Sequence, residues 1–407
     1  MGAERIVILG AGHAGGTAAA LLRQWGHEGP ITLLGEEPLV PYQRPPLSKA
    51  WLKGEAGAED LELKPESFYP EHDIALRLSV RAIAIDRKAK TVELEDGERL
   101  PYDLLILAMG ARARKLPVPG VDLEGVLELR TAADAEELKA ALGPGRRLAV
   151  IGGGYIGLEA AASARALGAE VTVIEREARL LPRVAGGDLS AFFHHYHEAR
   201  GVAFEVSQQV TAIEGEAGRV SGVRLSDGRF LPCDAALVGV GAQPNDEMAH
   251  AAGLDCSNGV VVDLEARTSD PAVYAIGDIT WRPLPLYGRP FRLESVPNAL
   301  EQARHAAAAI CGRPPPAPEV PWFWSDQYDL KLQIAGLTFD PDTAVLRGDM
   351  AAAKFAVFHL KQGVVVAVEA VNAPGEFMGG KLLIGRKAAV DPARLADLSV
   401  SMKEVAA

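Results

Sequence analysis

The stretch that decides the fold is Ile6-Val7-Ile8-Leu9-Gly10-Ala11-Gly12-His13-Ala14-Gly15, a short apolar run that leads into a glycine-rich turn. An Ala- and Leu-rich segment with helical spacing follows it. In such a turn the first glycine allows the tight bend, the second lets a pyrophosphate approach the backbone, and the third lets the helix pack on the strand. The free N–H groups at the start of the helix attract the phosphates. This stretch therefore predicts a strand–turn–helix unit that binds a dinucleotide.

The same pattern occurs again about 140 residues later, as Leu148-Ala149-Val150-Ile151-Gly152-Gly153-Gly154-Tyr155-Ile156-Gly157. Each copy is followed by a second apolar run with an acid at its end, Glu36 in the first copy and Glu175 in the second. A carboxylate at this position accepts hydrogen bonds from ribose hydroxyls. One glycine turn alone can be purely structural, but two complete copies favour two dinucleotide-binding domains. A further pair of similar segments, 96–110 and 227–241, keeps the same order in both halves.

Composition narrows the class of protein. The chain has 407 residues, 48% of them hydrophobic, and a net charge of −12, which argues against a nucleic-acid or membrane-surface binder. The three cysteines, Cys233, Cys256 and Cys311, lie far apart, so a redox-active Cys-x-x-Cys pair, a zinc ribbon and a ligand set for an iron–sulfur cluster are excluded. The apolar run at Ile6 leaves no room for a signal peptide, and no run reaches membrane length. We therefore expect a cytoplasmic protein that binds neither nucleic acid nor membranes, with no metal site.

A proline-rich tract at 313–318 predicts a linker. Beyond it, alternating runs at 331–335 and 355–360 predict a small antiparallel sheet with helices. The expected fold class is α/β, with two Rossmann-like dinucleotide-binding domains and a smaller α+β C-terminal domain. The expected boundaries are 1–113 with 241–319 for a discontinuous first domain, 114–240 for the second, and 320–407 for the third.

The two dinucleotides can be assigned to the two halves. Residues 268–278 form an apolar run that ends in Gly277-Asp278 and resembles the second FAD motif of flavoproteins with two dinucleotide-binding domains. Because this motif completes the first domain, FAD belongs to the first half and the nicotinamide nucleotide to the second. Glu175 favours NADH, since a carboxylate repels the 2′-phosphate of NADPH, although the neighbouring Arg176 and Arg183 weaken that preference. The candidate nucleotide-binding residues of the two turns are Gly10, Gly12, Ala14, Gly15, Glu36, Gly152, Gly154, Tyr155, Ile156, Gly157, Glu175, Arg183 and Gly241.

Three further segments are more specific than the glycine turns: 40–49 (VPYQRPPLSK), 292–303 (RLESVPNALEQA) and 321–327 (PWFWSDQ). With them the whole chain resembles the ferredoxin reductases of bacterial oxygenase systems, which are glutathione-reductase-like flavoproteins. The resemblance implies non-covalent FAD, NADH as hydride donor, and single-electron transfer to a [2Fe–2S] ferredoxin that serves a monooxygenase or a ring-hydroxylating dioxygenase. Such a chain would be a monomer or a weak homodimer.

The resemblance also implies roles for single residues. Lys49 would lie near the flavin ring, Glu159 would face the nicotinamide pocket and pair with Lys49, and Trp324 would cover the flavin. These three are the candidate catalytic residues. Ala14 and Glu36 would bind the FAD pyrophosphate and ribose, and the other FAD-binding candidates are Arg44, Ala82 beside the adenine, Arg130, Asp278 and Val296. Taken singly, Lys49 could be a surface lysine, Glu159 an ordinary helix residue and Trp324 a core residue. Met109 stands where relatives usually carry Thr.

Other classes of flavoprotein remain to be weighed. A disulfide reductase or a thiol-dependent NADH oxidase would need a cysteine near residues 35–63, and none is present. An NADH-binding flavoprotein similar to apoptosis-inducing factor, which acts by interaction, and a rubredoxin reductase stay open as alternatives. An acidic ferredoxin would need a local basic patch on this acidic chain. The candidates for that patch are Arg282, Arg289, Arg292, Lys331, Lys381, Arg386 and Lys387.

Overall fold

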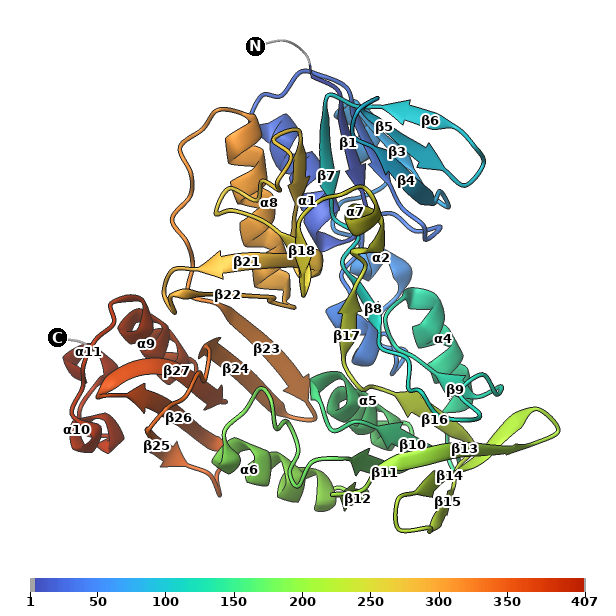
Figure 1. Cartoon of the computed structure of the whole chain (residues 1–407). Helices are drawn as coiled ribbons and strands as arrows, with labels where there is room; N and C mark the ends of the chain where they lie inside the picture. The colour runs from blue at the N-terminus through green and yellow to red at the C-terminus, as the bar shows by residue number, and fades with distance from the viewer. Residues whose placement is uncertain (1–3, 406–407) are drawn as a thin grey trace. The chain divides into compact units, whose positions relative to one another are not determined.

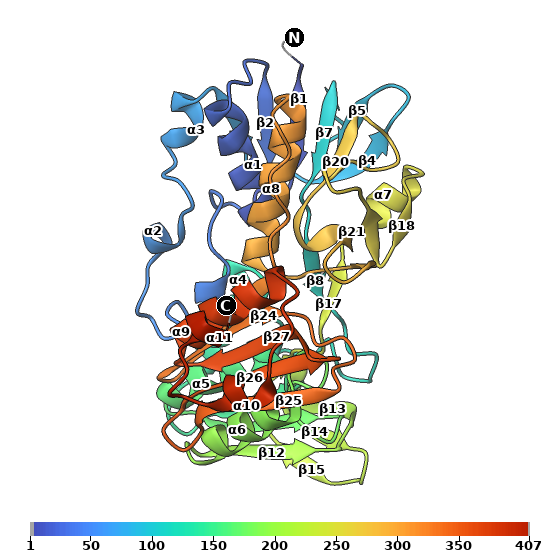
Figure 2. The same ribbon diagram turned by 90° about the vertical axis from the view of Figure 1, so that its left-hand side faces the viewer.

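The structure is a computed structural model that describes residues 4–405 (Figures 1 and 2). Contacts divide the chain into two compact units, and we describe each unit by itself. The boundaries of the units within the chain include one in β8 (Ala111–Ala113) and one in β17 (Ala242–Pro244). The first unit contains 4–44, 58–112 and 243–321, and the second contains 45–57, 113–242 and 322–405. The expected division into three domains is finer than this one and stays a prediction.

A five-stranded parallel sheet is the centre of the first unit. Its strand order is β20 (Val273–Ala275), β7 (Leu104–Leu107), β1 (Ile6–Leu9), β2 (Ile31–Leu34) and β3 (Ile74–Arg77). Parallel strands buried on both faces are continuously apolar, which is the composition of β1 and β7, and β2 departs from it only at Thr32. The predicted dinucleotide-binding architecture of this half is confirmed.

Successive side chains of a strand point to opposite faces, so this sheet contributes to two separate hydrophobic cores. Ile6 and Ile8 join a core with α1 (His13–Gln24) and α8 (Val296–Ile310), two helices that lie side by side in Figure 2. Val7 and Leu9 face the opposite core. That core includes residues of the antiparallel sheet of β4 (Ala82–Asp86), β5 (Thr91–Leu94) and β6 (Arg99–Pro101).

The remaining elements of the first unit are short. A four-stranded sheet contains β18 (Cys256–Ser257), β19 (Gly259–Val261), β21 (Thr280–Leu284) and β22 (Arg289–Phe291). The short helices are α2 (Ala58–Leu61), α3 (Phe68–Glu71), α7 (Glu247–Ala251) and the 3-10 helix η2 (Gly277–Ile279).

The second unit repeats the first architecture. Its parallel sheet has the order β12 (Val202–Val206), β11 (Glu170–Glu175), β10 (Arg147–Ile151), β16 (Ala235–Val238) and β9 (Val126–Leu127). An antiparallel sheet of β13 (Val210–Glu216), β14 (Arg219–Leu225) and β15 (Phe230–Pro232) corresponds to β4–β6. The helical segments are η1 (Pro45–Ser48), α4 (Ala132–Ala141), α5 (Tyr155–Ala166) and α6 (Gly187–Glu198). The internal duplication predicted from the sequence is therefore present in the fold.

The C-terminal part of the second unit is an antiparallel sheet with helices, as its alternating runs predict. The strand order is β23 (Trp322–Gln327), β24 (Leu330–Gly336), β27 (Val364–Val371), β26 (Lys354–Lys361) and β25 (Thr343–Asp349). The helices are α9 (Pro374–Gly385), α10 (Pro392–Ala396) and α11 (Met402–Val405). Across residues 4–405, the helices are all too short or too polar to cross a membrane.

One buried cation holds the end of the chain on this sheet. Arg347 on β25 is 4% exposed and donates hydrogen bonds to the carbonyl oxygens of Leu395 at 3.0 Å, Asp397 at 2.6 Å and Val400 at 2.8 Å. Hydrogen bonds to a charged donor are stronger than neutral ones. A single side chain therefore binds three carbonyl groups of the segment from α10 onward.

We expect Arg347→Met to release this segment, because the three carbonyl groups lose their donor. The free energy of unfolding of this part should fall by about 3 kcal/mol, and amides near 395–400 should exchange faster by mass spectrometry. Lys361→Met on neighbouring β26 is the control, since Lys361 is half exposed and 3.9 Å from Asp340. Unchanged exchange in Arg347→Met would contradict the anchoring role.

Candidate nucleotide and electron-transfer site

The first glycine turn lies between β1 and α1. Gly10 has φ +109°, and a side chain there would meet the carbonyl oxygen of Ala108 at 2.3 Å. A Cβ on Gly15 would meet the carbonyl oxygen of Gly10 at 1.9 Å, whereas a Cβ on Gly12 would meet nothing within 4 Å. The outer two glycines are therefore required by the chain's own packing, while the middle one borders open space.

The second glycine turn, between β10 and α5, has the same geometry. Gly152 has φ +112°, and a Cβ there would lie 2.4 Å from the carbonyl oxygen of Gly239. A Cβ on Gly157 would lie 2.4 Å from the carbonyl oxygen of Gly152, and a Cβ on Gly154 would meet nothing within 4 Å. Both turns thus leave one backbone position open for a close approach.

The helices that begin at these turns leave room for an anion. Gly12 and Gly154 are the N-cap residues of α1 and α5, neither has a side-chain cap, and neither helix has an acid in its first turn. The N–H groups at such a helix start are without intrahelical partners and favour negative charge. Both turns therefore fit the pyrophosphate of a dinucleotide, as the sequence predicts.

The acids that follow the two turns differ in their surroundings. The Glu36 side chain is 70% exposed, lies two residues beyond the end of β2, and is 3.7 Å from the Arg81 guanidinium. Glu175 is 9% exposed at the end of β11, and its carboxylate accepts hydrogen bonds from the N–H groups of Gly153 at 2.8 Å and Glu177 at 2.9 Å. Only the second acid is fixed to its own glycine turn.

Asp278 lies next to the first turn. It belongs to η2, and a Cβ on the preceding Gly277 would meet the side chain of Ala14 at 3.1 Å. The N–H of Gly277 donates to the Gln302 side chain on α8 at 2.8 Å. The first unit therefore brings together Ala14, the glycine turn and Asp278, as the first-domain assignment requires.

Arg44 is held by a residue that the sequence analysis did not single out. Its guanidinium is 2.6 Å from Glu37 Oε1 and 3.2 Å from the hydroxyl of Tyr42, which donates to the other oxygen of Glu37 at 2.6 Å. The signal in the sequence that could have identified Glu37 was its place beside Glu36 after β2. Glu37 orients Arg44 within the first unit.

Lys49 and Glu159 form a buried ion pair, as expected from the resemblance. The Lys49 ammonium lies 2.6 Å from Glu159 Oε2, with side chains 17% and 7% exposed. It also donates to the carbonyl oxygen of Pro45 at 3.2 Å. The hydroxyl of Ser48 donates to Oε2 at 2.5 Å, and that of Ser325 donates to Oε1 at 2.6 Å. Both oxygens of the carboxylate are therefore held by donors.

Ser48 and Ser325 are functional candidates that the sequence analysis missed. Ser48 is the residue before Lys49, and Ser325 follows Trp324 on β23. Their adjacency to two named candidates was the only sequence signal. Trp324 itself is half-buried and its ring lies 5.7 Å from that of Trp322. The second unit thus places Trp324 one residue from a donor to Glu159.

The other candidates lie at the ends of elements. Ala82 is the first residue of β4, Val296 the first of α8, and Arg130 directly precedes the N-cap of α4. Gly241 has φ +109°, and a Cβ there would lie 3.4 Å from the exposed Arg183 guanidinium. At the start of α5, the hydroxyl of Tyr155 donates to the carbonyl of Val184 at 3.3 Å, and Ile156 is 49% exposed.

The prediction that Arg282 and Arg292 belong to an exposed basic patch is wrong. Arg282 is 3% exposed and pairs with Glu301 at 2.8 Å while donating to Asn298 at 3.0 Å, so it is a core residue. The Arg292 side chain is 9% exposed and pairs with Glu294. A buried cation that already has an acidic partner cannot attract a ferredoxin. Arg289, Lys331, Arg386 and Lys387 are exposed, and Lys381 is partly exposed.

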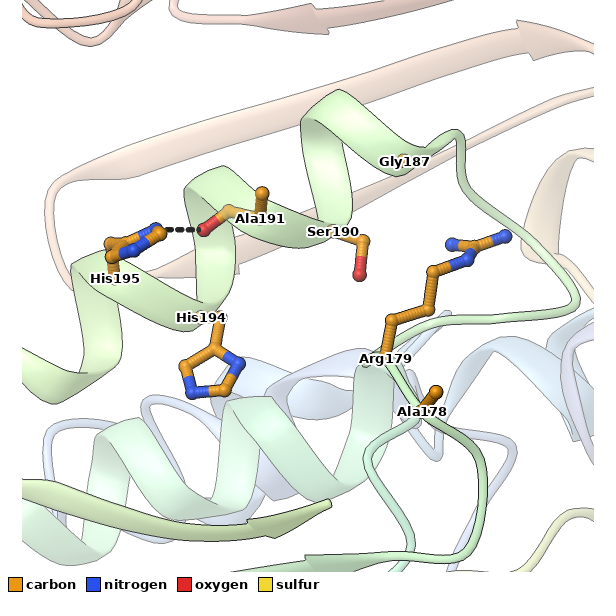
Figure 3. A pocket seen from close by; sticks show the side chains of 7 residues that line it. All are labelled: Ala178, Arg179, Gly187, Ser190, Ala191, His194 and His195. Carbon is orange, nitrogen blue, oxygen red and sulfur yellow. Dashed lines mark hydrogen bonds between the residues drawn. The ribbon is translucent and has the colours of Figure 1, made fainter. Parts of the chain in front are cut away.

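A hollow of about 290 Å³ lies beside α6 (Figure 3). It is lined by Ala178, Arg179, Gly187, Ser190, Ala191, His194 and His195. Its polar groups already have partners inside the protein: Arg179 donates to the carbonyls of Pro182 and Ala185, and Ser190 to that of Leu180. The hollow therefore offers little unsatisfied polarity to a ligand.

Comparisons with known proteins agree with this geometry. Residues 4–303 match the pyridine nucleotide-disulphide oxidoreductase family, and residues 322–406 match the reductase C-terminal family. The chain is 54% identical to a probable ferredoxin reductase of Castellaniella defragrans, with 99% of each chain covered. It is 43% identical to the putidaredoxin reductase of Pseudomonas putida, covering 99% of this chain and 97% of that one. In the crystal structure of the covalent putidaredoxin reductase–putidaredoxin complex, the matching chain has a TM-score of 0.96 at 43% identity, with 99% and 98% covered.

These matches confirm the resemblance to ferredoxin reductases and the expected cofactors, FAD and NAD(H). The family name refers to disulphides, but Cys233, Cys256 and Cys311 are all free in this chain. The match over residues 4–303 places the chain in the pyridine nucleotide-disulphide oxidoreductase family, as a flavin- and NAD(H)-dependent oxidoreductase.

Proposed function

We propose that this protein takes hydride from NADH and passes single electrons to a [2Fe–2S] ferredoxin that serves an oxygenase. The observation that carries the proposal is the presence of two open glycine turns in a chain whose three cysteines are free. Two electrons that enter such a chain have no internal dithiol to receive them. The flavin supplies the chemistry that accepts two electrons and releases them singly.

The chain's own residues would bind and orient the two cofactors. The turn at Gly12, with Ala14 and Asp278, would hold the FAD pyrophosphate, and the turn at Gly154 would hold that of NADH. Lys49 would place a positive charge near the flavin, where negative charge develops on reduction. Glu159 would orient the Lys49 ammonium, and Trp324 would exclude water. Arg44, Ala82, Arg130 and Val296 would complete the FAD site, with Glu36 on its ribose.

The choice of acceptor is supported by the relatives. Putidaredoxin reductase is one, and the ferredoxin reductase component of the anthranilate 1,2-dioxygenase system of Burkholderia cepacia is 44% identical to this chain. A rubredoxin reductase of Pseudomonas putida is 42% identical, which keeps rubredoxin as the second candidate acceptor. We further propose a cytoplasmic monomer or weak dimer, with the domains 1–113 plus 241–319, 114–240 and 320–407.

We expect anaerobic NADH to bleach the flavin absorbance within seconds. An excess of oxidised [2Fe–2S] ferredoxin, added with excess NADH, should then become reduced over repeated turnovers. Rubredoxin is added in a parallel cuvette at the same concentration. Slow flavin reduction that ends in a long-lived NADH complex, with neither acceptor reduced, would contradict the proposed function and favour a protein that acts by interaction.

Alanine at the two open glycines should separate the two nucleotide sites. Gly12→Ala should fold but lose most of its FAD, because the new methyl group occupies the space for the pyrophosphate. Gly154→Ala should keep FAD and bind NADH at least tenfold more weakly. The measurements are the ratio of flavin to protein absorbance and the dissociation constant of NADH.

Gly375→Ala on α9 is the matched control, since a Cβ there also meets nothing within 4 Å. It should change neither flavin content nor NADH affinity. Loss of FAD from Gly154→Ala but not from Gly12→Ala would reverse the assignment of the two sites.

The proposed preference for NADH depends on the charge of Glu175. Glu175→Gln keeps the size of the side chain but removes its repulsion of a 2′-phosphate. We expect kcat/KM for NADPH relative to NADH to rise roughly tenfold, about 1.4 kcal/mol. Glu170→Gln, at the exposed start of the same strand β11, is the control and should leave the ratio unchanged. An unaltered ratio in Glu175→Gln would show that another residue excludes NADPH.

A further inference from the structure

A row of polar side chains leads away from Glu159 into the interior of the second unit. Ser325, which donates to Glu159 Oε1 at 2.6 Å, itself accepts a hydrogen bond from Gln327 Nε2 at 3.0 Å. The side-chain oxygen of Gln327 lies 2.7 Å from His197 Nε2 on α6. The hydroxyl of Tyr328 lies 3.2 Å from His197 Nδ1. Five residues from three parts of the chain are therefore joined by consecutive hydrogen bonds.

The protonation states in this row follow from burial. Burial lowers the pKa of His197 to about 4, so its ring is neutral near pH 7 and has one N–H and one acceptor nitrogen. Burial also raises the pKa of Tyr328 to about 12, so its hydroxyl keeps its proton. The hydrogen bond with Gln327 opposes this lowering of the His197 pKa, and the charge of Arg200 adds to it. The row therefore consists of neutral groups that end on one carboxylate.

The direction of every hydrogen bond is then determined. The Glu159 carboxylate accepts, so Ser325 gives its hydrogen to it, and the oxygen of Ser325 in turn accepts from the amide nitrogen of Gln327. The amide oxygen of Gln327 must then accept from His197 Nε2, which therefore has the ring proton. Nδ1 is left as an acceptor, and the hydroxyl of Tyr328 donates to it. All four bonds run toward the carboxylate, and aligned hydrogen bonds polarise and strengthen one another.

We propose that Ser325, Gln327 and His197 are positioning residues for Glu159, which they hold by this one-way chain of hydrogen bonds so that the carboxylate orients Lys49. Ser48 holds the other oxygen of the same carboxylate, so the group is fixed from two sides. The expected effect of these residues on catalysis rests on the proposed function of the Lys49–Glu159 pair.

Burial argues that the chain has a purpose beyond packing. Ser325 and Gln327 are each 1% exposed and His197 is 0% exposed. Burying polar groups is costly unless each finds a partner, and apolar side chains of similar size would fill the same space. A row that is satisfied throughout and ends on a charged pair fixes one geometry. An apolar core would leave the Glu159 Oε1 atom without its donor.

The kinetic test uses the holoenzyme and Gln327→Met, which keeps the length of the side chain but interrupts the chain. In anaerobic stopped flow we expect the limiting rate of flavin reduction by NADH to fall roughly tenfold, with the apparent dissociation constant of NADH changed less than twofold. Ser325→Ala should have the same effect, and Ser325→Thr, which keeps the hydroxyl, should recover most of the rate.

His195→Gln is the matched control, because His195 lies on the same helix but is exposed and bonds only to the carbonyl of Ala191. NADH should reduce the flavin of this variant as fast as that of the wild type. A lowered Tm in Gln327→Met with an unchanged limiting rate would show that the chain only stabilises the fold, and would overturn the proposal.

A second readout does not depend on turnover. Nitrogen NMR of selectively labelled histidine in the oxidised holoenzyme should show His197 as a neutral ring protonated on Nε2. The ring should lose this fixed tautomer in Gln327→Met but keep it in His195→Gln. A proton on Nδ1 in the wild type would mean that the chain runs the other way, which would overturn the inference. If NADH fails to reduce the wild-type flavin, the proposed function fails, and the NMR result still decides the hydrogen-bond direction.

Discussion

The buried pairing of Glu159 with Lys49 is the constraint on which the arrangement of the second unit depends. A carboxylate that is 7% exposed needs donors, and Glu159 on α5 takes them from Ser48 in η1, from Lys49 directly after it, and from Ser325 on β23. These elements come from distant parts of the sequence. The bonds of Ser48 and Lys49 to this carboxylate are among the contacts that join the short segment 45–57 to the second unit, although the residues on either side of it belong to the first.

The glycine turns could be predicted because their requirements are local. Gly10 and Gly152 need a positive φ, and Gly15 and Gly157 need the absence of a side chain, within ten residues of sequence that also shows the preceding strand. The antiparallel C-terminal sheet was predictable for the same reason, since the alternation at the start of β24 and the apolar run of β26 are visible without knowing their neighbours. Local sequence was sufficient wherever the residues that determine an element lie within that element.

The partners of Glu159 could not be found in this way. Ser48 is 111 residues from Glu159, Ser325 is 166 residues from it, and His197 is 130 residues from Gln327. Serine, glutamine and histidine are ordinary surface residues in most sequences, and only the fold brings these together. The same limit accounts for Arg282, because nothing near it in the sequence shows that Glu301 on α8 would pair with it in the core.

The two copies of the nucleotide-binding architecture differ where their cofactors differ. A tightly held flavin has no close competitor at its ribose, so an exposed Glu36 after β2 is sufficient in the first copy. NADH must be distinguished from NADPH at each turnover, and that discrimination needs a negative charge in a fixed place. In the proposed function Glu175 would provide it, because two backbone N–H groups hold its carboxylate beside the glycine turn. Duplication supplied the same open glycine turn twice, and on this proposal the surroundings of one acid would make the second copy selective.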